Sequence, residues 1–581
     1  MPRVNNLPAE HLRFDMRDAV YAAAGAVVVF FLASVMLSGW PGGLTPNFSY
    51  PYVYAGDGLF QLWLIERVME GWSFTNSREG FPFGSPSFDF PGSDAGNLLI
   101  SKVLGKLSGS YYAASNAYVL LGFSATFAAS YLVLRRMAIR REIALAASLL
   151  FAFLPYHFFR LLMGHAFYTW YFVIPVYFHL GYRLFNAAPG DLKYPRVLKY
   201  CASAFVASWF GVYFALFGAF TGMVCGLAGS ARRRAWRPTL VAIAVGASIT
   251  AGVLVNVAPN LAYALKHGKN PEVAQRSPVA TEILSLKVMH LVIPHQLHRI
   301  EPVRDFAQRY ASSFPLSNTV SYVGLVGLFG LVLLGTAFVR AMAGQPIDQR
   351  MALLVLLTGT SLMVITVGGL NVLFAMFISP MIRGWDRFSI FIAFYAIAAA
   401  ALWADSRWPR AGAAPVALTA LVAITALGLA DQTIKSETLV ALSNKEVFFQ
   451  DRSFAGAVES ALPRGAAIYQ LPYTAFPESA NLQSLGTYDH LAGYLNSKEL
   501  RWSSGGMQGR EADRFYRALA QRPLTEQVTI VKSLGFAGIW VDRRGYADNG
   551  ASVIEELSRI VGAPPILARE DGTIVFFRMP N

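Results

Sequence analysis

Apolar runs of about twenty residues recur along the chain, and no other feature restricts the fold as strongly. A helix needs about twenty apolar residues to cross the roughly 30 Å of hydrocarbon in a bilayer, where no water can satisfy an open backbone. The sequence therefore predicts a polytopic α-helical membrane protein. We expect eleven spans, approximately at residues 19–40, 113–134, 142–158, 167–185, 198–211, 213–230, 238–258, 320–340, 351–370, 386–404 and 412–430.

The pair of spans at 198–230 has two interpretations, because "SWFGVYF" predicts either a tight reversal or a kink in one helix. Basic residues favour two crossings. Only then do the loops rich in arginine and lysine all fall on one side, which the positive-inside rule assigns to the cytoplasm. The residues in these loops are Arg13, Arg17, Arg135, Arg136, Arg140, Arg141, Lys193, Arg196, Lys199, Arg232, Arg233, Arg234, Arg237, Arg340, Arg350, Arg407 and Arg410. We expect the N-terminus inside and the C-terminus outside.

Charge and cysteine content exclude two classes of protein. The net charge is +14, but the excess lies mostly in the short loops between apolar runs, so membrane lipids are the expected partner and nucleic acid is not. Cys201 and Cys225 both lie in apolar runs. We therefore expect neither a disulfide framework nor a cysteine-based metal site.

Three long segments are predicted to face outward: 41–112, 259–319 and 431–581. The second carries "EILSLKVMHLVIPHQLHRI", which predicts an interfacial amphipathic helix over about 282–298. In the third, strand-like "AAIYQLP", "FAGIWVD" and "GTIVFFRM" alternate with helix-like "READRFYRALAQR", "TEQVTIVKSLG" and "SVIEELSRIVG". This pattern predicts a transmembrane domain over 1–430 followed by an α/β domain over 431–581.

Acidic residues gather in the first outward segment, whereas the spans carry almost no charge. Ionisable groups within spans usually mark a transport path, so their scarcity disfavours a transporter. Asp57 stands between glycines in "YAGDG", directly after the first span. A carboxylate placed where a substrate can approach closely suits a general base. The alternative is that Asp57 caps the helix that begins at Gly58.

About thirty residues further on, "FPFGSPSFDFPGSD" supplies two more acids, Asp89 and Asp94. We count both as catalytic candidates, with Asp94 ahead. The alternative is that they hold turns in a segment rich in Gly, Pro and Ser.

Two basic clusters are expected at the outward ends of spans. "PYHFFRLLMGHAFYTW" contributes His157, Arg160 and His165, and "SPMIRGWDRFSIF" contributes Arg383 and Arg387. Arginine binds phosphate with a bidentate fork and histidine can donate to it, so both clusters are candidates for a lipid phosphate. The alternatives are anchoring in the membrane interface for the first cluster and a salt bridge to Asp386 for the second.

The tail segment "LRWSSGGMQGR" is a candidate acceptor-binding patch. Trp502 could stack on a sugar ring, with Arg501 and Arg510 beside it. Tryptophan is as often a core residue, which is the alternative. Phosphate-binding glycine loops, nucleophile elbows and Asp-x-Asp pairs are absent from the sequence, so a nucleotide site is not expected.

This layout resembles the GT-C superfamily of integral-membrane glycosyltransferases. The resemblance rests on the number of spans, the acid after the first span in "YAGDG", further acids in "FDFPGSD", outward amphipathic helices and a C-terminal outward domain. "GDGLFQLWLIERVMEGW", "FPFG" and "YDHLAGYLNSKELRWSSGGMQGR" are similar to a bacterial group of membrane glycosyltransferases or sugar translocases. The resemblance implies a multi-pass protein of the bacterial inner membrane, with a polyprenyl-phosphate sugar donor and a glycan or lipid acceptor.

The expected reaction follows from these candidates. Asp57 would accept the proton of the acceptor hydroxyl, arginines would stabilise the leaving phosphate, and one displacement would invert the anomeric centre. This chemistry needs no metal, although a divalent ion bridging Asp57 and Asp94 stays open. Three alternatives remain: a flippase or exporter of lipid-linked sugars, a transferase of another group onto a surface polymer, and a scaffold that presents the C-terminal domain.

Overall fold

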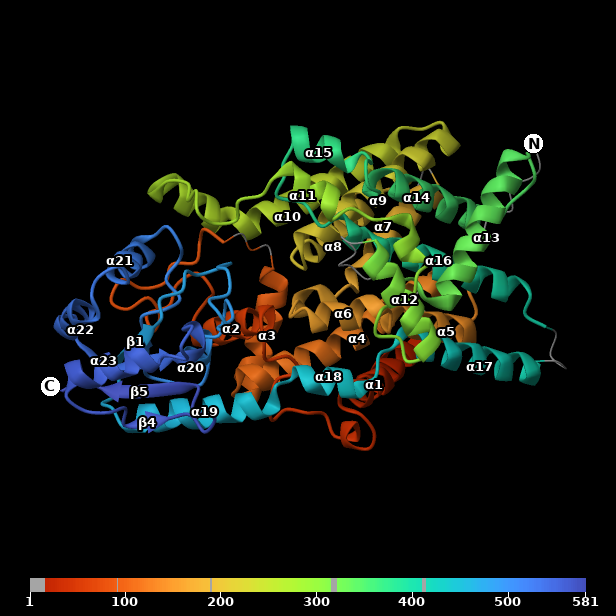
Figure 1. The fold of residues 1–581 in the computed structure, drawn as a ribbon. Coiled ribbons are helices and arrows are strands. Elements are labelled where there is room, and N and C mark those ends of the chain that lie inside the picture. Colours follow the sequence, from red (N-terminus) through yellow and green to blue (C-terminus); the bar gives the residue numbers. More distant parts are fainter. Residues whose placement is uncertain are drawn as a thin grey trace.

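The computed structural model describes residues 16–90, 92, 94–188, 191–314, 321–409 and 414–580. Arg13 and Arg410, two of the basic residues used for the topology, lie outside this set. The first part of the described chain is helical and the last part combines helices with a sheet, so the predicted fold class is confirmed (Figure 1).

Helices lie at all eleven predicted spans, although the span 142–158 is divided between α5 and α6, and residues 320, 412 and 413 of two spans lie outside the described residues. Eight helical segments are long and apolar enough to cross a membrane, and α14 is a shorter apolar helix. α7 and α8 have 14 residues each. The helices of this part are α1 (Met16–Ser38), α4 (Tyr111–Arg136), α5 (Arg141–Ala152), α6 (Pro155–Leu162), α7 (Val173–Asn186), α8 (Tyr194–Ala207), α9 (Val212–Arg233), α10 (Arg237–His267), α13 (Gly324–Met342), α14 (Gln349–Ile365), α16 (Ser389–Ser406) and α17 (Ala414–Gln432).

The ambiguous segment at 198–230 forms two helices, α8 and α9, separated by a short turn that ends at Gly211. Loops that carry the basic residues also meet one another. Arg140 pairs with Asp405 at 3.1 Å, and Arg350 donates to the carbonyl of Met137 at 2.8 Å. The basic loops after α4, α13 and α16 are thus brought together, as expected if they share one side of the membrane.

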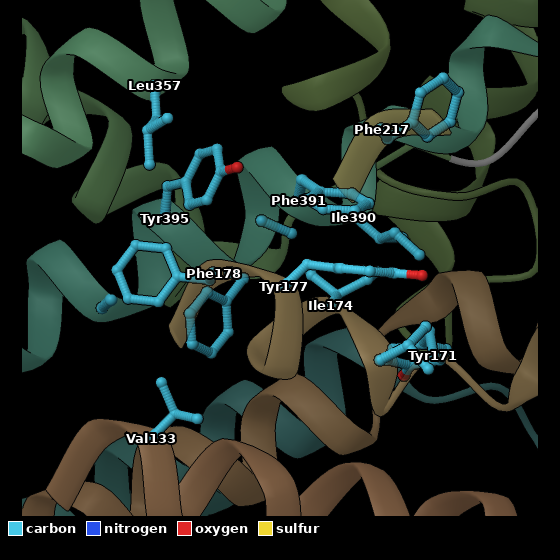
Figure 2. Close-up of a cluster of buried hydrophobic side chains, with 14 of the residues drawn as sticks. Val133, Tyr171, Ile174, Tyr177, Phe178, Phe217, Leu357, Ile390, Phe391 and Tyr395 are labelled. Carbon is cyan, nitrogen blue, oxygen red and sulfur yellow. The ribbon is translucent and has the colours of Figure 1, made fainter. Parts of the chain in front are cut away.

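Aromatic side chains from several helices fill the centre of the helical part (Figure 2). Val133 of α4, Phe178 of α7, Phe217 of α9, Leu357 of α14 and Tyr395 of α16 are all buried there. Lipid tails are as apolar as these side chains, so close packing rather than exclusion from water holds such helices together.

The first long segment, 41–112, folds into two helices, α2 (Asp57–Glu70) and α3 (Ala95–Ser108). Arg67 of α2 forms a fully buried ion pair with Glu79 at 2.9 Å, and Trp63 donates to the same carboxylate at 2.7 Å. These bonds tie the loop after α2 back onto the helix, which fixes the helix that begins at Asp57.

The second long segment differs from its prediction. The stretch 282–298 is not an amphipathic helix: α11 (Pro278–Ile283) ends early, and only a short 3-10 turn (Val288–Leu291) follows. Leu286 instead exchanges backbone hydrogen bonds with Ile365 and Val367 at the end of α14, and these bonds compete with helix formation. Pro294 further on cannot donate within a helix. The longer helix of this segment is α12 (Glu301–Ser313).

The C-terminal part contains a five-stranded sheet with the order β2-β1-β3-β5-β4. β1 pairs in parallel with β2 and β3, whereas β5 pairs antiparallel with β3 and β4. All three predicted strands and all three predicted helices are present; the two-residue strands β2 and β4 were not predicted. The strands are β1 (Ala467–Leu471), β2 (Arg501–Trp502), β3 (Phe536–Asp542), β4 (Leu567–Ala568) and β5 (Ile574–Arg578).

Helices cover this sheet and link it to the rest of the molecule. Figure 1 shows the domain (blue) on one side of the helical part, with α2 next to it. Phe476 of this domain packs against Trp63 of α2 with ring centroids 4.9 Å apart. The remaining helices are α15 (Asn371–Phe377), α18 (Ser436–Leu442), α19 (Lys445–Ser460), α20 (Leu491–Leu495), α21 (Glu511–Leu519), α22 (Leu524–Ser533) and α23 (Ala551–Val561).

Candidate active site

Asp57 is the first residue of α2, and its side chain is 52% exposed. The backbone reaches it through Gly56, whose φ of +48° and ψ of −131° strain any residue with a side chain. The carboxylate does not cap the helix: the N-cap position is Gly56, and the side-chain bond of Asp57 within the described chain goes to His165. Space beside Gly56 is open, whereas Gly58 packs on Val53. Only the first of the two glycines leaves room for a substrate.

His165 reaches Asp57 from the turn between α6 and the 3-10 helix η3 (Ala166–Thr169). Its Nε2 lies 2.9 Å from Oδ2 of Asp57. Burial lowers the pKa of His165, while the bond to Asp57 opposes that shift. The imidazole is therefore neutral at pH 7, and Nε2–H donates to the carboxylate. The turn comes this close because Gly164 crosses the start of α2: a Cβ on Gly164 would lie 2.1 Å from the amide nitrogen of Gly58.

Arg160 of α6 is buried and neutralised. Its Nη2 lies 3.1 Å from Oδ2 of Asp386, and both side chains are almost inaccessible. Asp386 belongs to the 3-10 helix η5 (Trp385–Phe388), which leads into α16. The predicted salt bridge of Asp386 is therefore present, but its partner comes from α6 and not from the same turn.

Arg387, the next residue of η5, lies against two tyrosine rings. Its guanidinium carbon is 4.5 Å from the ring centroid of Tyr168 and 4.3 Å from that of Tyr213. Within the described residues, no carboxylate forms a salt bridge with Arg387. Tyr168 also contacts the His165 ring, with centroids 6.1 Å apart. A continuous series of contacts thus joins the Asp57 carboxylate to a guanidinium that has no salt-bridge partner among the described residues. We call Asp57, His165, Tyr168, Arg387 and Tyr213 the carboxylate–guanidinium cluster.

Asp94 lies on the Arg387 side of this cluster. Its Oδ1 accepts from Asn97 at 3.1 Å. Burial raises the pKa of Asp94 to about 6, although the bond from Asn97 and the positive charge of Arg387 both act in the opposite direction. The negative charge of Asp94 also bears on Tyr168. Asp94 is therefore an electrostatic neighbour of Arg387.

The structure places Asp89 and Arg510 away from this cluster and pairs them with each other. Two bonds of 2.7 and 2.6 Å join the carboxylate to Nε and Nη2 of Arg510. Arg510 also donates to the backbone carbonyls of His267 and Gly268. The pair clamps the first long segment to the second and to the C-terminal domain, so neither group is available for the roles predicted from the sequence.

Two other predicted binding residues are buried in packing. His157 has no exposed surface, and its ring stacks on Phe123 with centroids 3.4 Å apart. Trp502 is likewise inaccessible and packs edge-on against Trp540. The predicted stacking of Trp502 on a sugar is wrong, because the indole belongs to the core.

The last two predicted residues are exposed to different degrees. Arg501 lies on the edge strand β2, with its guanidinium over the ring of Phe81. Arg383 is partly exposed and lies beside the cluster, since its backbone amide is 3.4 Å from the hydroxyl of Tyr213. Arg383 therefore lies at the cluster, whereas the acceptor-binding role of Arg501 stays a prediction.

Sequence reasoning missed the tyrosines of the site. Tyr168 follows His165 by three residues, and Tyr213 belongs to the turn "SWFGVYF" that was considered only for its topology. Tyr488 of the C-terminal domain is a third: burial raises its pKa, and the negative charge of Asp57 adds to that shift. Tyrosines close to polar turns could have indicated the site. Aromatic residues are common at any membrane interface, however, so this pattern does not distinguish a site from an anchor.

The described residues contain no group of three or more His, Cys, Asp or Glu side chains placed to hold a metal ion. Asp57 is bonded to His165 and Asp94 to Asn97. The two acids are thus engaged with separate partners.

Comparison with known proteins gives structural matches alone: no family model and no curated protein sequence matches the chain. Three solved structures of an oligosaccharyltransferase from Archaeoglobus fulgidus are similar at 12% identity. The complex with zinc and sulfate has a TM-score of 0.43, and the match covers 93% of this chain and 69% of that one. The apo form has a TM-score of 0.45, and the match covers 94% of this chain and 71% of that one. The complex of AglB with an inhibitory peptide and a dolichol-phosphate has a TM-score of 0.46, over 95% of this chain and 72% of that one.

Proposed function

We propose that the chain is a membrane glycosyltransferase that moves a sugar from a polyprenyl-phosphate donor to a glycan or lipid acceptor. The observation that carries the proposal is the carboxylate–guanidinium cluster. A general base and a phosphate-binding group are the two parts that such a transfer requires. Asp57 is exposed and bonded to a neutral imidazole, and contacts through His165 and Tyr168 lead from it to Arg387.

The reaction uses each group at a stated atom. The acceptor hydroxyl loses its proton to Asp57 as its oxygen attacks the anomeric carbon from the face opposite the phosphate. The bond between that carbon and the phosphate oxygen breaks, and the electron pair stays on the phosphate. Arg387 stabilises the charge that develops there, because no carboxylate of the described chain forms a salt bridge with it. One displacement inverts the anomeric centre.

His165 positions the carboxylate. Its Nε2–H donates to Oδ2 of Asp57, which leaves Oδ1 to accept the acceptor proton. Because the imidazole is neutral, the pair keeps its negative charge and Asp57 stays a competent base.

Apolar surface next to Arg387 supports a lipid-linked donor. Phe374 of α15 packs on Trp385 of η5, with ring centroids 5.4 Å apart. On the same short helix, Leu373, Met376 and Phe377 are exposed. A lipid tail lying on these side chains would bring its phosphate to the turn that carries Arg387. We place the cluster on the periplasmic side of a bacterial inner membrane. The positive-inside rule assigns the basic loops to the cytoplasm, and these loops meet one another away from the cluster.

The test is transfer by purified protein in nanodiscs, with radiolabelled polyprenyl-phosphate sugars as donors. Asp57→Asn should lower the rate on the order of 10²–10⁴-fold, as expected for loss of a general base. Asp191→Asn is the control, since Asp191 forms an exposed ion pair with Arg196. Wild-type turnover by Asp57→Asn would refute the assignment of the base. Movement of labelled lipid between leaflets without any transfer would favour a flippase.

A further inference from the structure

A groove of about 740 Å³ opens on the surface between the last turn of α1 and the short helix α18. The two helices pack against each other (Figure 1). Pockets that bind small molecules usually measure about 300–1,000 Å³, so the groove has room for a ligand. None of its lining residues belongs to the carboxylate–guanidinium cluster. The lining residues are Val35, Met36, Ser38, Gly39, Trp40, Arg299, Ser436, Glu437, Val440 and Ala441.

The groove lies at the end of a membrane span. α1 ends at Ser38, and the side chain of Trp40 directly after it is 75% exposed. Leu44 and Phe48 in the same connection are also exposed. Exposed tryptophan next to a span is typical of the interface between membrane and water. The groove is therefore level with lipid headgroups, on the side of the membrane where we place the cluster.

Arg299 brings a positive charge to the groove. Its Nε donates to the carbonyl and the hydroxyl of Thr433 at 3.2 and 3.0 Å, and its Nη2 donates to the carbonyl of Ile434 at 2.7 Å. These bonds hold the guanidinium in place. No described residue accepts from Nη1 or forms a salt bridge with Arg299, so a donor and the charge remain for an anion such as a phosphate.

Glu437 brings a negative charge to the same groove. It belongs to the first turn of α18, and its side chain is exposed. Its charge bears on Arg299, yet no salt bridge of Glu437 is present in the described part of the chain. A groove with one available cation and one available carboxylate is complementary to a ligand that carries both charges.

Apolar side chains provide much of the remaining lining. Val35 and Met36 come from α1 and Val440 from α18, and Trp40 lies at the same groove. Val440 and Trp40 are exposed. A small soluble ion would leave this apolar surface uncovered, whereas hydrocarbon chains would cover it. The ligand is therefore expected to carry acyl chains as well as two charges.

We infer that the groove binds a zwitterionic phospholipid with an ammonium headgroup, a phosphatidylethanolamine. Its phosphate accepts from Arg299, its ammonium donates to Glu437, and the first part of its acyl chains lies against Val35, Met36 and Val440. A phosphatidylglycerol has the phosphate but no cation for the carboxylate. The inference concerns a structural lipid and does not depend on the proposed transfer reaction.

The test is native mass spectrometry of the full-length protein in detergent, with phosphatidylethanolamine and phosphatidylglycerol of identical acyl chains as probes. Wild type should retain phosphatidylethanolamine at an about fivefold lower concentration, as expected for one additional exposed ion pair. Glu437→Gln should remove this preference. Glu446→Gln is the matched control and should keep it, because Glu446 is also an exposed glutamate in the first turn of a helix, α19, but does not line the groove. Equal retention of the two lipids by wild type, or an undiminished preference in Glu437→Gln, would overturn the inference.

Photocrosslinking locates the bound lipid. A phosphatidylethanolamine with a diazirine near the headgroup end of one acyl chain should form adducts within 35–40 and 436–441, as mapped by peptide mass spectrometry. Ala441→Trp, which fills the groove, should remove these adducts and weaken retention. Ala518→Trp adds the same side chain at an exposed position of α21 and should change neither. Adducts confined to other segments, or adducts undiminished in Ala441→Trp, would exclude the groove as the site.

Discussion

At the scale of single residues, the site depends on which charges are neutralised and which are not. Arg160 and Arg387 both lie at the turn formed by η5, but only Arg160 forms a salt bridge, with Asp386. Arg387 is held by aromatic faces instead. Ring faces attract a cation without cancelling its charge, so Arg387 keeps its capacity to bind an anion.

Replacement of Arg387 by lysine should therefore be severe although the charge is kept. A lysine has no planar guanidinium to lie over the rings of Tyr168 and Tyr213, and it cannot offer a bidentate fork. We expect Arg387→Lys to slow transfer on the order of 10²-fold. Arg501→Lys, at the edge of the C-terminal sheet, serves as the control and should keep its rate. Equal rates for the two variants would remove Arg387 from the phosphate site.

The half-buried acid near Arg387, Asp94, gives a pH-dependent prediction. The folded-state pKa of Asp94 is about 6, above its ordinary value of 3.8. Between these values the folded state binds more protons than the unfolded state, so the contribution of Asp94 to stability falls as pH rises and is constant above about pH 7. Asp94→Asn does not titrate. The melting temperature of Asp94→Asn minus that of wild type should therefore increase from pH 4.5 to pH 6.5. The corresponding change in the free energy of unfolding is at most about 3 kcal/mol. A difference that is independent of pH would contradict this prediction.

At the scale of elements, one crossing holds the proposed base beside its histidine. The turn after α6 passes over the start of α2 with two backbones in contact, which Gly164 permits through its φ of +73° and its missing side chain. The cluster therefore depends on a packing contact between elements more than one hundred residues apart.

Substitution of that glycine should damage both stability and transfer. In Gly164→Ala, the Cβ would clash with the backbone of Gly58, and φ would be strained by about 1 kcal/mol before the clash is counted. We expect a lower melting temperature and at least a tenfold loss of transfer. Gly222→Ala of α9 is the matched control, because its Cβ meets nothing within 4 Å. Wild-type transfer by Gly164→Ala would show that the crossing does not position Asp57.

At the scale of the whole molecule, polar contacts join the C-terminal domain to both long segments. Besides the clamp of Asp89 and Arg510, Arg276 pairs with Glu478, and Arg517 pairs with Glu272 at 2.7 Å. These contacts hold Tyr488 near Asp57. The domain is thus attached to both long segments through ion pairs.

Breaking the Asp89 clamp should loosen this attachment. The Asp89 side chain is almost inaccessible and Arg510 is mostly covered, so Asp89→Ala leaves a guanidinium without its partner at a cost of about 1–3 kcal/mol. We expect a lower melting temperature and faster proteolysis between the helical part and the C-terminal domain. Arg522→Gln breaks an exposed pair and should change neither. Equal stability of Asp89→Ala and wild type would argue against the clamp.

The sequence by itself determined the membrane class, the positions of the helices at the predicted spans and the main strands and helices of the C-terminal domain. Each of these depends on local periodicity and on the thickness of a bilayer, which act within about twenty residues. It also indicated Asp57, His165, Arg160 and Arg387, because charged residues next to apolar spans are scarce and conspicuous.

Only the tertiary structure decided which of these residues work together. The sequence could not show that Asp386 pairs with Arg160 or that Asp89 pairs with Arg510, because each partner lies far away along the chain. It also could not show that Trp502 is buried, since the residues that cover it are distant in the sequence. It also could not show that Leu286, within the stretch 282–298, would form backbone hydrogen bonds with the end of α14 instead of lying in a helix. Pairing and burial are fixed by long-range packing, and packing is a property of the folded molecule.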